Sequence, residues 1–523
     1  MSKLPNKIDN IISKVRKNGF NPVVGNVWLM QEYWKTWWRG NVNGFHSFSQ
    51  KINGVTRKFD RLTLNTFKMV CEEWESLIWS EKVELKVTNN DQANERLQEV
   101  LKENNDYIEM GNLIEKTFAL GTGLTLVYKS DNKTQIDYIS GQRFIPIAFE
   151  NNKMTGVITI NESIISISEK PAYVTHLTYH YLENDVYTIK HEVYVSDKDS
   201  DLGQYSFNNI YYVFSKQEAD AMVTTIITED GKTYQTHQVT IPTNRAFFQL
   251  YRPNITNNYD ESVMGISIGA NTINLHESID IKFDASKNEI LNNKTRIIVN
   301  SKFLKTQAVE NEQTGGVEYI KYLDDQDTVV FGIPFEEDEN VIEHFQGEFR
   351  TEDIKVGLNE DIQLLGWRSG FGKKYFSFTD GEVYVNDKNV MSSNSALYKN
   401  KKKHENLIGQ ALLDKAYSIL YLEQDMGNIQ VDVNSLIIEV QFDDSIINDD
   451  ETILATMKTD ASEGFIPKWR YVMNRYKLTE QEAKDWVKEA DEEDSFNASI
   501  AIESQEEPEE PEMEENIEDE SEE

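Results

Sequence analysis

The chain is most distinctive at residues 28–82, which read WLMQEYWKTWWRGNVNGFHSFSQKINGVTRKFDRLTLNTFKMVCEEWESLIWSEK. Four tryptophans, Trp28, Trp34, Trp37 and Trp38, fall within its first eleven residues. Its second half repeats apolar residues at steps of three and four, which is the spacing of one apolar helix face. No catalytic signature lies in this stretch. It therefore predicts a mainly helical assembly element, in which the tryptophans serve both the core and an interface because four large rings rarely bury in one small helical unit.

Length and composition limit the class of protein. At 523 residues the chain is too long for one hydrophobic core, so several domains are expected. No run of about 18 apolar residues exists, so no membrane span is expected. The first seven residues are charged without a following apolar segment, so no secretory signal is expected. Cys71 is the single cysteine, which excludes an internal disulfide and a Cys-rich metal site. A protein of the cytoplasm, or of a particle assembled there, is predicted.

The net charge of −36 is large and uneven. Residues 489–523 hold 18 acidic residues and no Lys or Arg, and the other 488 residues carry the remaining −18. This balance argues against tight binding to DNA phosphates, which needs a basic surface. It is compatible with DNA that passes transiently, because a negatively charged surface repels the duplex and prevents tight binding.

The order of hydropathy patterns predicts an α+β protein with a projecting stalk. Antiparallel strands are expected over residues 122–250, and a small β insert at 295–335 lies between helical patterns at 260–290 and 349–366. Apolar residues around both of these helices need neighbours to cover them, which suggests a ring or bundle of subunits. The candidate interface residues are Trp34, Trp37, Trp38, Ile268, Leu275, Ile279 and Phe283.

Two glycine-containing motifs raise enzymatic alternatives. Residues 265–269 match G-x-S-x-G, but the nucleophile elbow requires a preceding strand, and residues 257–262 do not make one. A helix start whose small residues allow close subunit contact is favoured over a hydrolase using Ser267. Residues 366–374 resemble a P-loop, yet the glycine spacing is one residue too long and Lys374 replaces the required hydroxyl. No cofactor is therefore expected.

The histidines and lysines are open to two interpretations. His176 and His180 share one face of a predicted strand, but no third zinc ligand is identifiable, so ordinary sheet histidines are favoured and no metal is expected. The basic run 399–404 could contact DNA phosphates, although a charged helix turn offsetting nearby acids is favoured. Better candidates for DNA contact, if the irregular segment 370–392 lines a channel, are Lys373, Lys374 and Lys388.

Several short motifs follow one another over most of residues 28–490. They are Trp34…Trp37-Trp38-Arg39-Gly40 with Phe45-His46, Val70-Cys71-Glu72-Glu73-Trp74, Gly265-Ile266-Ser267-Ile268, Gly370-Phe371-Gly372 before Phe376-Ser377-Phe378, Phe442-Asp443-Asp444-Ser445 and Tyr476-Lys477-Leu478-Thr479-Glu480. Each piece is weak alone, but the colinear set resembles the portal proteins of tailed bacteriophages, in particular siphophages of Gram-positive bacteria.

The resemblance implies an α+β portal fold with a wing, a two-helix stem, a small β clip and a helical crown. The implied domains are a lead-in (1–27), a wing that is helical and then β-rich (28–256), a first stem helix (257–294), a clip (295–345), a second stem helix (346–369), a tunnel loop (370–392), a long wing helix with a return strand (393–445), a crown (446–490) and a disordered acidic tail (491–523). The acidic tail is not part of the family pattern.

The resemblance also implies a function and partners. Portal proteins form a non-enzymatic ring of about twelve subunits at one capsid vertex, through which double-stranded DNA enters during packaging and leaves during ejection. The implied partners are the terminase large subunit, head-completion or adaptor proteins, and the major capsid and scaffolding proteins, with assembly in the host cytoplasm and no membrane. Another head–tail connector or capsid component is the alternative, which the length and the stalk disfavour.

Overall fold

The computed structural model describes residues 6–52, 54–80, 83–167, 169–227, 233–292, 296–300, 304–310, 317–322, 330–333, 342–345, 350–372, 375–376, 387–442 and 450–503. The chain divides into two compact units, residues 1–443 and 444–523. Among the described residues, no helix is both long enough and apolar enough to cross a membrane. The architecture is mixed α+β, as predicted.

Helices form one side of the first unit. They are α2 (Asn26–Trp38), α3 (Thr66–Ile78), α4 (Asp91–Glu103), α5 (Asp106–Leu120) and α9 (Asp387–Asp425). The apolar face predicted for the second half of residues 28–82 is confirmed, because α3 buries Phe67, Val70, Trp74 and Ile78. Helix α9 begins inside the segment predicted as irregular, since its first residue is Asp387.

The prediction that residues 28–82 are mainly helical is wrong in the middle of the stretch. Strands β1 (Ser47–Ile52) and β2 (Val55–Asp60) form an antiparallel hairpin there. The turn contains Gly54, whose φ of +83° lies in the left-handed region that glycine adopts without a steric penalty. Asn53-Gly54 between alternating residues is a strong hairpin signal, and it outweighs the helical pattern on either side.

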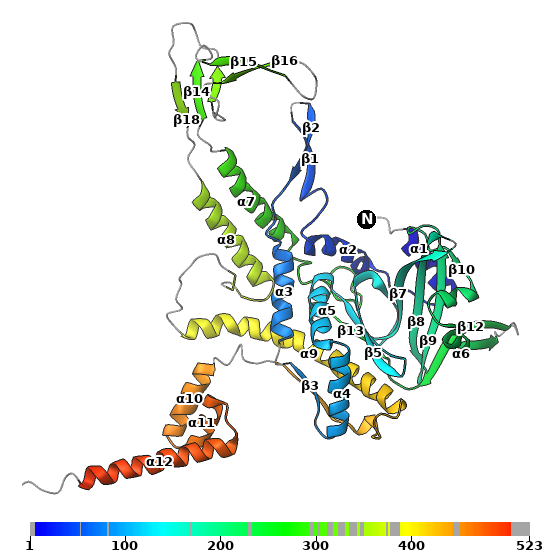
Figure 1. Cartoon of the computed structure of the whole chain (residues 1–523), viewed down its shortest axis with the longest axis vertical. Helices are drawn as coiled ribbons and strands as arrows, with labels where there is room; N and C mark the ends of the chain where they lie inside the picture. Colours follow the sequence, from blue (N-terminus) through cyan, green and yellow to red (C-terminus); the bar gives the residue numbers. More distant parts are fainter. Residues whose placement is uncertain are drawn as a thin grey trace, which may run out of the picture. The chain divides into compact units, whose positions relative to one another are not determined.

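Antiparallel sheets form the other side of the unit, as the alternating sequence predicts (Figure 1). The larger sheet has the strand order β11 (Val223–Ile227), β12 (Thr233–Pro242), β9 (Val186–Ser196), β8 (Lys170–Glu183), β7 (Lys153–Ile167) and β6 (Phe144–Glu150), with β10 (Gln204–Tyr205) paired to β9. A smaller sheet has the order β13 (Phe248–Tyr251), β4 (Gly123–Ser130) and β5 (Lys133–Ser140), and β3 (Glu84–Val87) pairs with β19 (Ile438–Gln441). Helix α1 (Asn6–Lys17) buries Ile11 and Val15 in one cluster with residues of β6 to β9, and the short α6 (Lys216–Ala221) follows β10.

Two helices lie side by side and carry strands at their far ends (Figure 1). They are α7 (Ile273–Asn292) and α8 (Thr351–Arg368). The strands between them are β14 (Arg296–Asn300), β15 (Lys305–Glu310), β16 (Val317–Tyr322), β17 (Val330–Ile333) and β18 (Ile342–Phe345). The predicted helix–β–helix order is therefore confirmed.

The second unit is helical. It contains α10 (Asp450–Ser462), α11 (Lys468–Tyr476) and α12 (Glu480–Glu503). A capping box begins α12, because the Thr479 hydroxyl accepts from the Glu482 backbone N–H and the Glu482 carboxylate accepts from Thr479 N–H at 2.9 Å. The helix extends to Glu503, so the prediction of a disordered tail from residue 491 is wrong for residues 491–503. Residues 504–523 lie outside the described residues.

Candidate functional site

A buried polar anchor fixes the base of the β1–β2 hairpin to α7. The Val42 N–H donates to His46 Nδ1 at 2.8 Å, so the ring carries its proton on Nε2 and donates it to Asp280 Oδ2 at 2.9 Å. Asp280 also accepts from the Thr63 hydroxyl and from Leu64 N–H, both at 2.9 Å. His46 and Asp280 are 5% and 2% exposed, so the imidazole has no water to replace the carboxylate, whereas Thr63 and Leu64 are only partly buried.

The opposite side of α7 holds α8. Asp361 of α8 accepts from Lys282 Nζ at 2.7 Å and from the Ser278 hydroxyl at 2.6 Å. Residues two apart on a helix are separated by about 200°, so Ser278 and Lys282 point away from Asp280. The hairpin base and α8 therefore flank α7 on opposite sides.

The predicted interface residues divide by exposure. Trp34, Trp37 and Ile279 are at most 2% exposed, and the ring of Trp37 lies 5.3 Å from that of Phe45 and 5.4 Å from that of His46. These three side chains thus lie in the core of their own subunit. Ile268 is also buried, at 7% exposed, whereas Trp38, Leu275 and Phe283 are only partly buried.

The segment predicted as a tunnel loop begins on an aromatic cluster. Phe371 is buried with its ring 4.7 Å from Trp74, and Trp74 Nε1–H donates to the Ser369 carbonyl at 3.0 Å. The imidazole of His404 also lies 4.7 Å from the indole, and burial lowers the pKa of His404 to about 3. The cluster thereby joins α3, α9 and the end of α8. Of the three predicted DNA contacts, Lys388 lies in the first turn of α9, whereas Lys373 and Lys374 lie outside the described residues.

Helix α9 is joined to the body by buried ion pairs. Lys415 Nζ lies 2.7 Å and 2.9 Å from the two carboxylate oxygens of Asp106 in α5, and the Lys415 side chain is fully buried. Arg96 of α4 donates to Glu423 at 2.6 Å. In the basic run 399–404, Lys401 pairs with Glu405 at 2.9 Å, which confirms the charged-turn interpretation for that lysine.

Ser267 does not have the surroundings of a nucleophile. It is fully buried, its hydroxyl donates to the Phe118 carbonyl at 3.2 Å, and it accepts from Gly269 N–H. The residues around it form a turn, and α7 begins only at Ile273. The prediction that residues 265–269 start a helix is therefore wrong. A Cβ on Gly265 would lie 2.2 Å from the Gly121 carbonyl, so the small residues allow close packing within the chain.

The paired histidines are buried sheet residues. His176 Nε2 lies 3.1 Å from His191 Nδ1, and His180 Nδ1 lies 2.9 Å from the Tyr187 hydroxyl. Burial lowers the pKa of His176 to about 4 and that of His180 to about 3. No group of three or more His, Cys, Asp or Glu in the described part of the chain is arranged to hold a metal ion.

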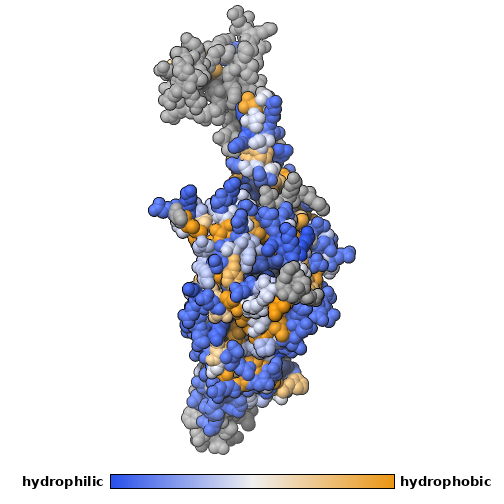
Figure 2. Space-filling model, turned by 90° about the vertical axis from the view of Figure 1, so that its right-hand side faces the viewer, coloured by the Kyte–Doolittle hydropathy of each residue, from blue (hydrophilic) through white to orange (hydrophobic). Residues whose placement is uncertain are grey.

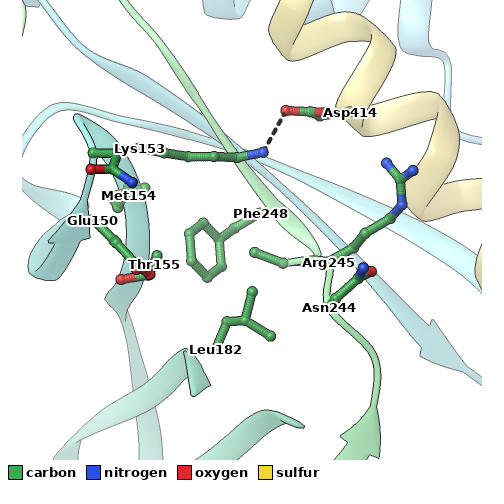
Figure 3. A pocket seen from close by; sticks show the side chains of 11 residues that line it. Glu150, Lys153, Met154, Thr155, Leu182, Asn244, Arg245, Phe248 and Asp414 are labelled. Carbon is green, nitrogen blue, oxygen red and sulfur yellow. Dashed lines mark ion pairs between the residues drawn. The ribbon is translucent and has the colours of Figure 1, made fainter. Parts of the chain in front are cut away.

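A surface pocket of about 360 Å³ lies between the β6–β7 turn and α9 (Figure 3). Phe248 forms its floor, and Lys153 reaches across it to Asp414, with 3.4 Å between Nζ and Oδ2. The guanidinium of Arg245 lies 4.3 Å from the ring of Tyr417. This lining offers one exposed ion pair and a cation–π contact, so it explains how the β6–β7 turn is held near α9 without suggesting a reaction.

The sequence interpretation missed the hairpin and the buried polar anchors. The Asn53-Gly54 pair was a usable signal for the hairpin. The pairs His46–Asp280 and Lys415–Asp106 join residues 234 and 309 positions apart, and nothing local in the sequence indicates them.

The family described as "Phage portal protein, SPP1 Gp6-like" matches residues 33–495, which is most of the chain. No curated protein matches the sequence. On the length of the family match, this chain belongs to the phage portal proteins of the SPP1 Gp6-like family.

Proposed function

We propose that this protein forms a ring of about twelve subunits at one vertex of the capsid. The ring's central channel would admit double-stranded DNA during packaging and release it during ejection. The observation that carries the proposal is the helix–β–helix excursion, in which α7 and α8 are held together by Asp361 and carry strands at their far ends. A pair of helices with exposed apolar residues gains stability when neighbouring pairs cover it.

In this proposal each part of the chain has one role. Helices α7 and α8 are the stem, residues 295–345 are the clip, and residues 446–490 are the crown. Residues 28–256, with α9 crossing them, are the wing. The clip would meet the terminase large subunit during packaging and the head-completion or adaptor proteins afterwards, while the capsid and scaffolding proteins would surround the wing.

The channel would carry little positive charge. The chain outside residues 489–523 has a net charge of −18, so an acidic wall would let DNA slide without sticking. The exceptions that we propose are Lys373, Lys374 and Lys388, at the segment that would face the duplex. Trp38, Leu275 and Phe283, which are only partly buried, remain our candidates for contacts between subunits.

Electron microscopy of the purified protein tests the ring directly. End views with a central hole and about twelve-fold symmetry are the expected result, and single particles persisting at high concentration and in the presence of scaffolding protein would contradict the proposal. A second measurement tests the division of labour, in which a separate motor supplies the energy. The purified ring should not hydrolyse ATP, and turnover by the purified ring would refute that division.

A further inference from the structure

The β1–β2 hairpin projects from the body without a partner strand among the described residues. Its strands pair only with each other in the described structure, and Val55 is 59% exposed. An isolated two-stranded hairpin is marginally stable in water, so such a projection is expected to gain order from something that covers it.

One face of the hairpin is apolar and aromatic, because successive side chains of a strand point to opposite faces. Phe48 and Phe59 are directly opposite in the register and stack with their ring centroids 5.7 Å apart. Val55 and the pair of Gln50 with Arg57 continue the same face towards the tip. Figure 2, drawn from the right-hand side of Figure 1, shows hydrophobic residues scattered among hydrophilic ones over that side of the molecule.

The hairpin is also basic in a strongly acidic chain. Residues 47–61 contain two Lys, two Arg and one Asp, against a net charge of −36 for the whole protein. Among the described residues, no carboxylate pairs with Lys51, Arg57 or Lys58. The surface that covers this hairpin should therefore combine apolar area with acidic groups.

The outer half of α8 has that combination. Its inner face buries Leu358 and Ile362, while Val356 on the outer face is 59% exposed. Glu352, Asp353 and Glu360 are exposed on the same outer face, as the 100° step of a helix places them within about 100° of one another.

Within one subunit the two surfaces cannot meet. The Leu62 N–H donates to Asp284 on one side of α7, and Lys282, two residues earlier, donates to the Gly357 carbonyl of α8 on the other side. The hairpin base and the outer half of α8 thus lie at the same height along α7 but on opposite sides of it. A head-to-tail ring brings such opposite surfaces of neighbouring copies together.

We propose that the β1–β2 hairpin of one subunit docks, by its aromatic face, on residues 352–360 of α8 in the next copy of this chain. The inference rests on the proposed ring and adds to it a specific contact between subunits. Arg57, which shares the aromatic face, would lie opposite the carboxylates of Glu352, Asp353 and Glu360, and Phe48 and Phe59 would cover Val356.

Cross-linking of cysteine variants tests the contact. Gln50→Cys places a thiol on the aromatic face and Val356→Cys places one on α8, while the native Cys71 is fully buried and does not compete. The double variant, treated with a short bis-maleimide, should give a ladder of covalent multimers, and each single variant should stay monomeric in a denaturing gel. The control pairs Val356→Cys with Ile227→Cys, which is 72% exposed on β11, and should cross-link at least tenfold less.

A charge swap tests the same contact independently. Arg57→Glu should weaken ring assembly about tenfold or more, because like charges then face each other at the aromatic face. Adding Glu352→Lys and Glu360→Lys should restore assembly to within about threefold of the parent protein. A merely misfolded hairpin would not be rescued by changes on another helix.

The outcomes separate this inference from the proposed function. Rings without cross-links, together with charge reversals that leave assembly unchanged, would overturn the docking and leave the ring intact. If those reversals instead reduced the retention of linear double-stranded DNA by intact rings, the hairpin would be a DNA contact and the docking would be wrong. Absence of both rings and cross-links would overturn the ring and the inference with it.

Discussion

Replacing Asp280 with alanine should strongly destabilise the joint between the hairpin base and α7. The carboxylate accepts from His46 Nε2–H, the Thr63 hydroxyl and the Leu64 N–H, each at 2.9 Å. A hydrogen bond to a charged group contributes about 1.5–3 kcal/mol, and leaving a buried donor unsatisfied costs about 1–3 kcal/mol. Because Thr63 and Leu64 are only partly buried and can recover water, the full loss should be about 3 kcal/mol.

Thermal unfolding at one fixed protein concentration measures this loss. At roughly 2 °C per kcal/mol for a large domain, the midpoint of Asp280→Ala should fall by about 6 °C. The matched control is Asp284→Ala, one turn further along α7, because Asp284 accepts from exposed groups at Leu62 and Asn288. That control should shift the midpoint by less than about 2 °C. A midpoint for Asp280→Ala within 1 °C of the parent protein would refute the assignment of the buried carboxylate as the anchor.

Four further predictions concern other parts of the chain. Burial lowers the pKa of His176 to about 4 and of His180 to about 3, so below pH ~6.5 the unfolded chain binds protons that the folded protein does not. The free energy of unfolding should therefore be highest above pH ~6.5 and fall between ~6.5 and ~4 by roughly 1.4 kcal/mol per pH unit per histidine. A melting midpoint equal at pH 7.5 and 5.5 would contradict this. Lys415→Met should lower the free energy of unfolding, measured with a chemical denaturant, by about 3–5 kcal/mol because it leaves Asp106 charged and buried. The double variant Lys415→Met with Asp106→Leu should recover at least half of that loss. Trp74→Ala should lower the free energy of unfolding by about 3–5 kcal/mol and speed tryptic cleavage after Lys373 and Lys374. An unchanged cleavage rate would show that the aromatic cluster does not hold that segment. Truncation after Glu503 should leave the melting midpoint and the ring unchanged, since a segment as acidic as residues 504–523 cannot contribute a core, and loss of rings would show otherwise.

Local sequence patterns predicted the helices and strands of this protein better than the contacts between them. The apolar spacing in α3, the alternation in β7 to β9 and the helix–β–helix order all come from neighbours in the sequence, and the structure confirms them. The hairpin at Ser47–Asp60 was missed because the helical patterns on both sides were extended across Asn53-Gly54. The turn around Ser267 was misread because a run of small residues indicates close packing without indicating which chain provides the partner.

The tryptophans illustrate what the sequence could not decide. Trp34 and Trp38 are four residues apart on α2, yet Trp34 is fully buried and Trp38 keeps exposed area with its Nε1–H donating to Glu115 at 2.7 Å. Which ring enters the core depends on where α5 and the segment after Tyr259 pack, and those contacts join residues far apart in the chain.

Three polar contacts hold neighbouring elements of the first unit together, and their chemistry explains that position. His46 with Asp280 attaches the hairpin base to α7, Asp361 joins α7 to α8, and Lys415 with Asp106 attaches α9 to α5. Removing charges from water cancels much of what an ion pair contributes, so such pairs add little net stability compared with apolar contacts. Ion pairs and hydrogen bonds do require fixed distances and directions between their atoms. Apolar contacts do not, because two apolar surfaces can shift along each other. In the proposed ring, fixed contacts between these elements would keep the channel aligned while DNA moves through it. Asp280→Ala should therefore make the rings less uniform in end views even where the subunit still folds.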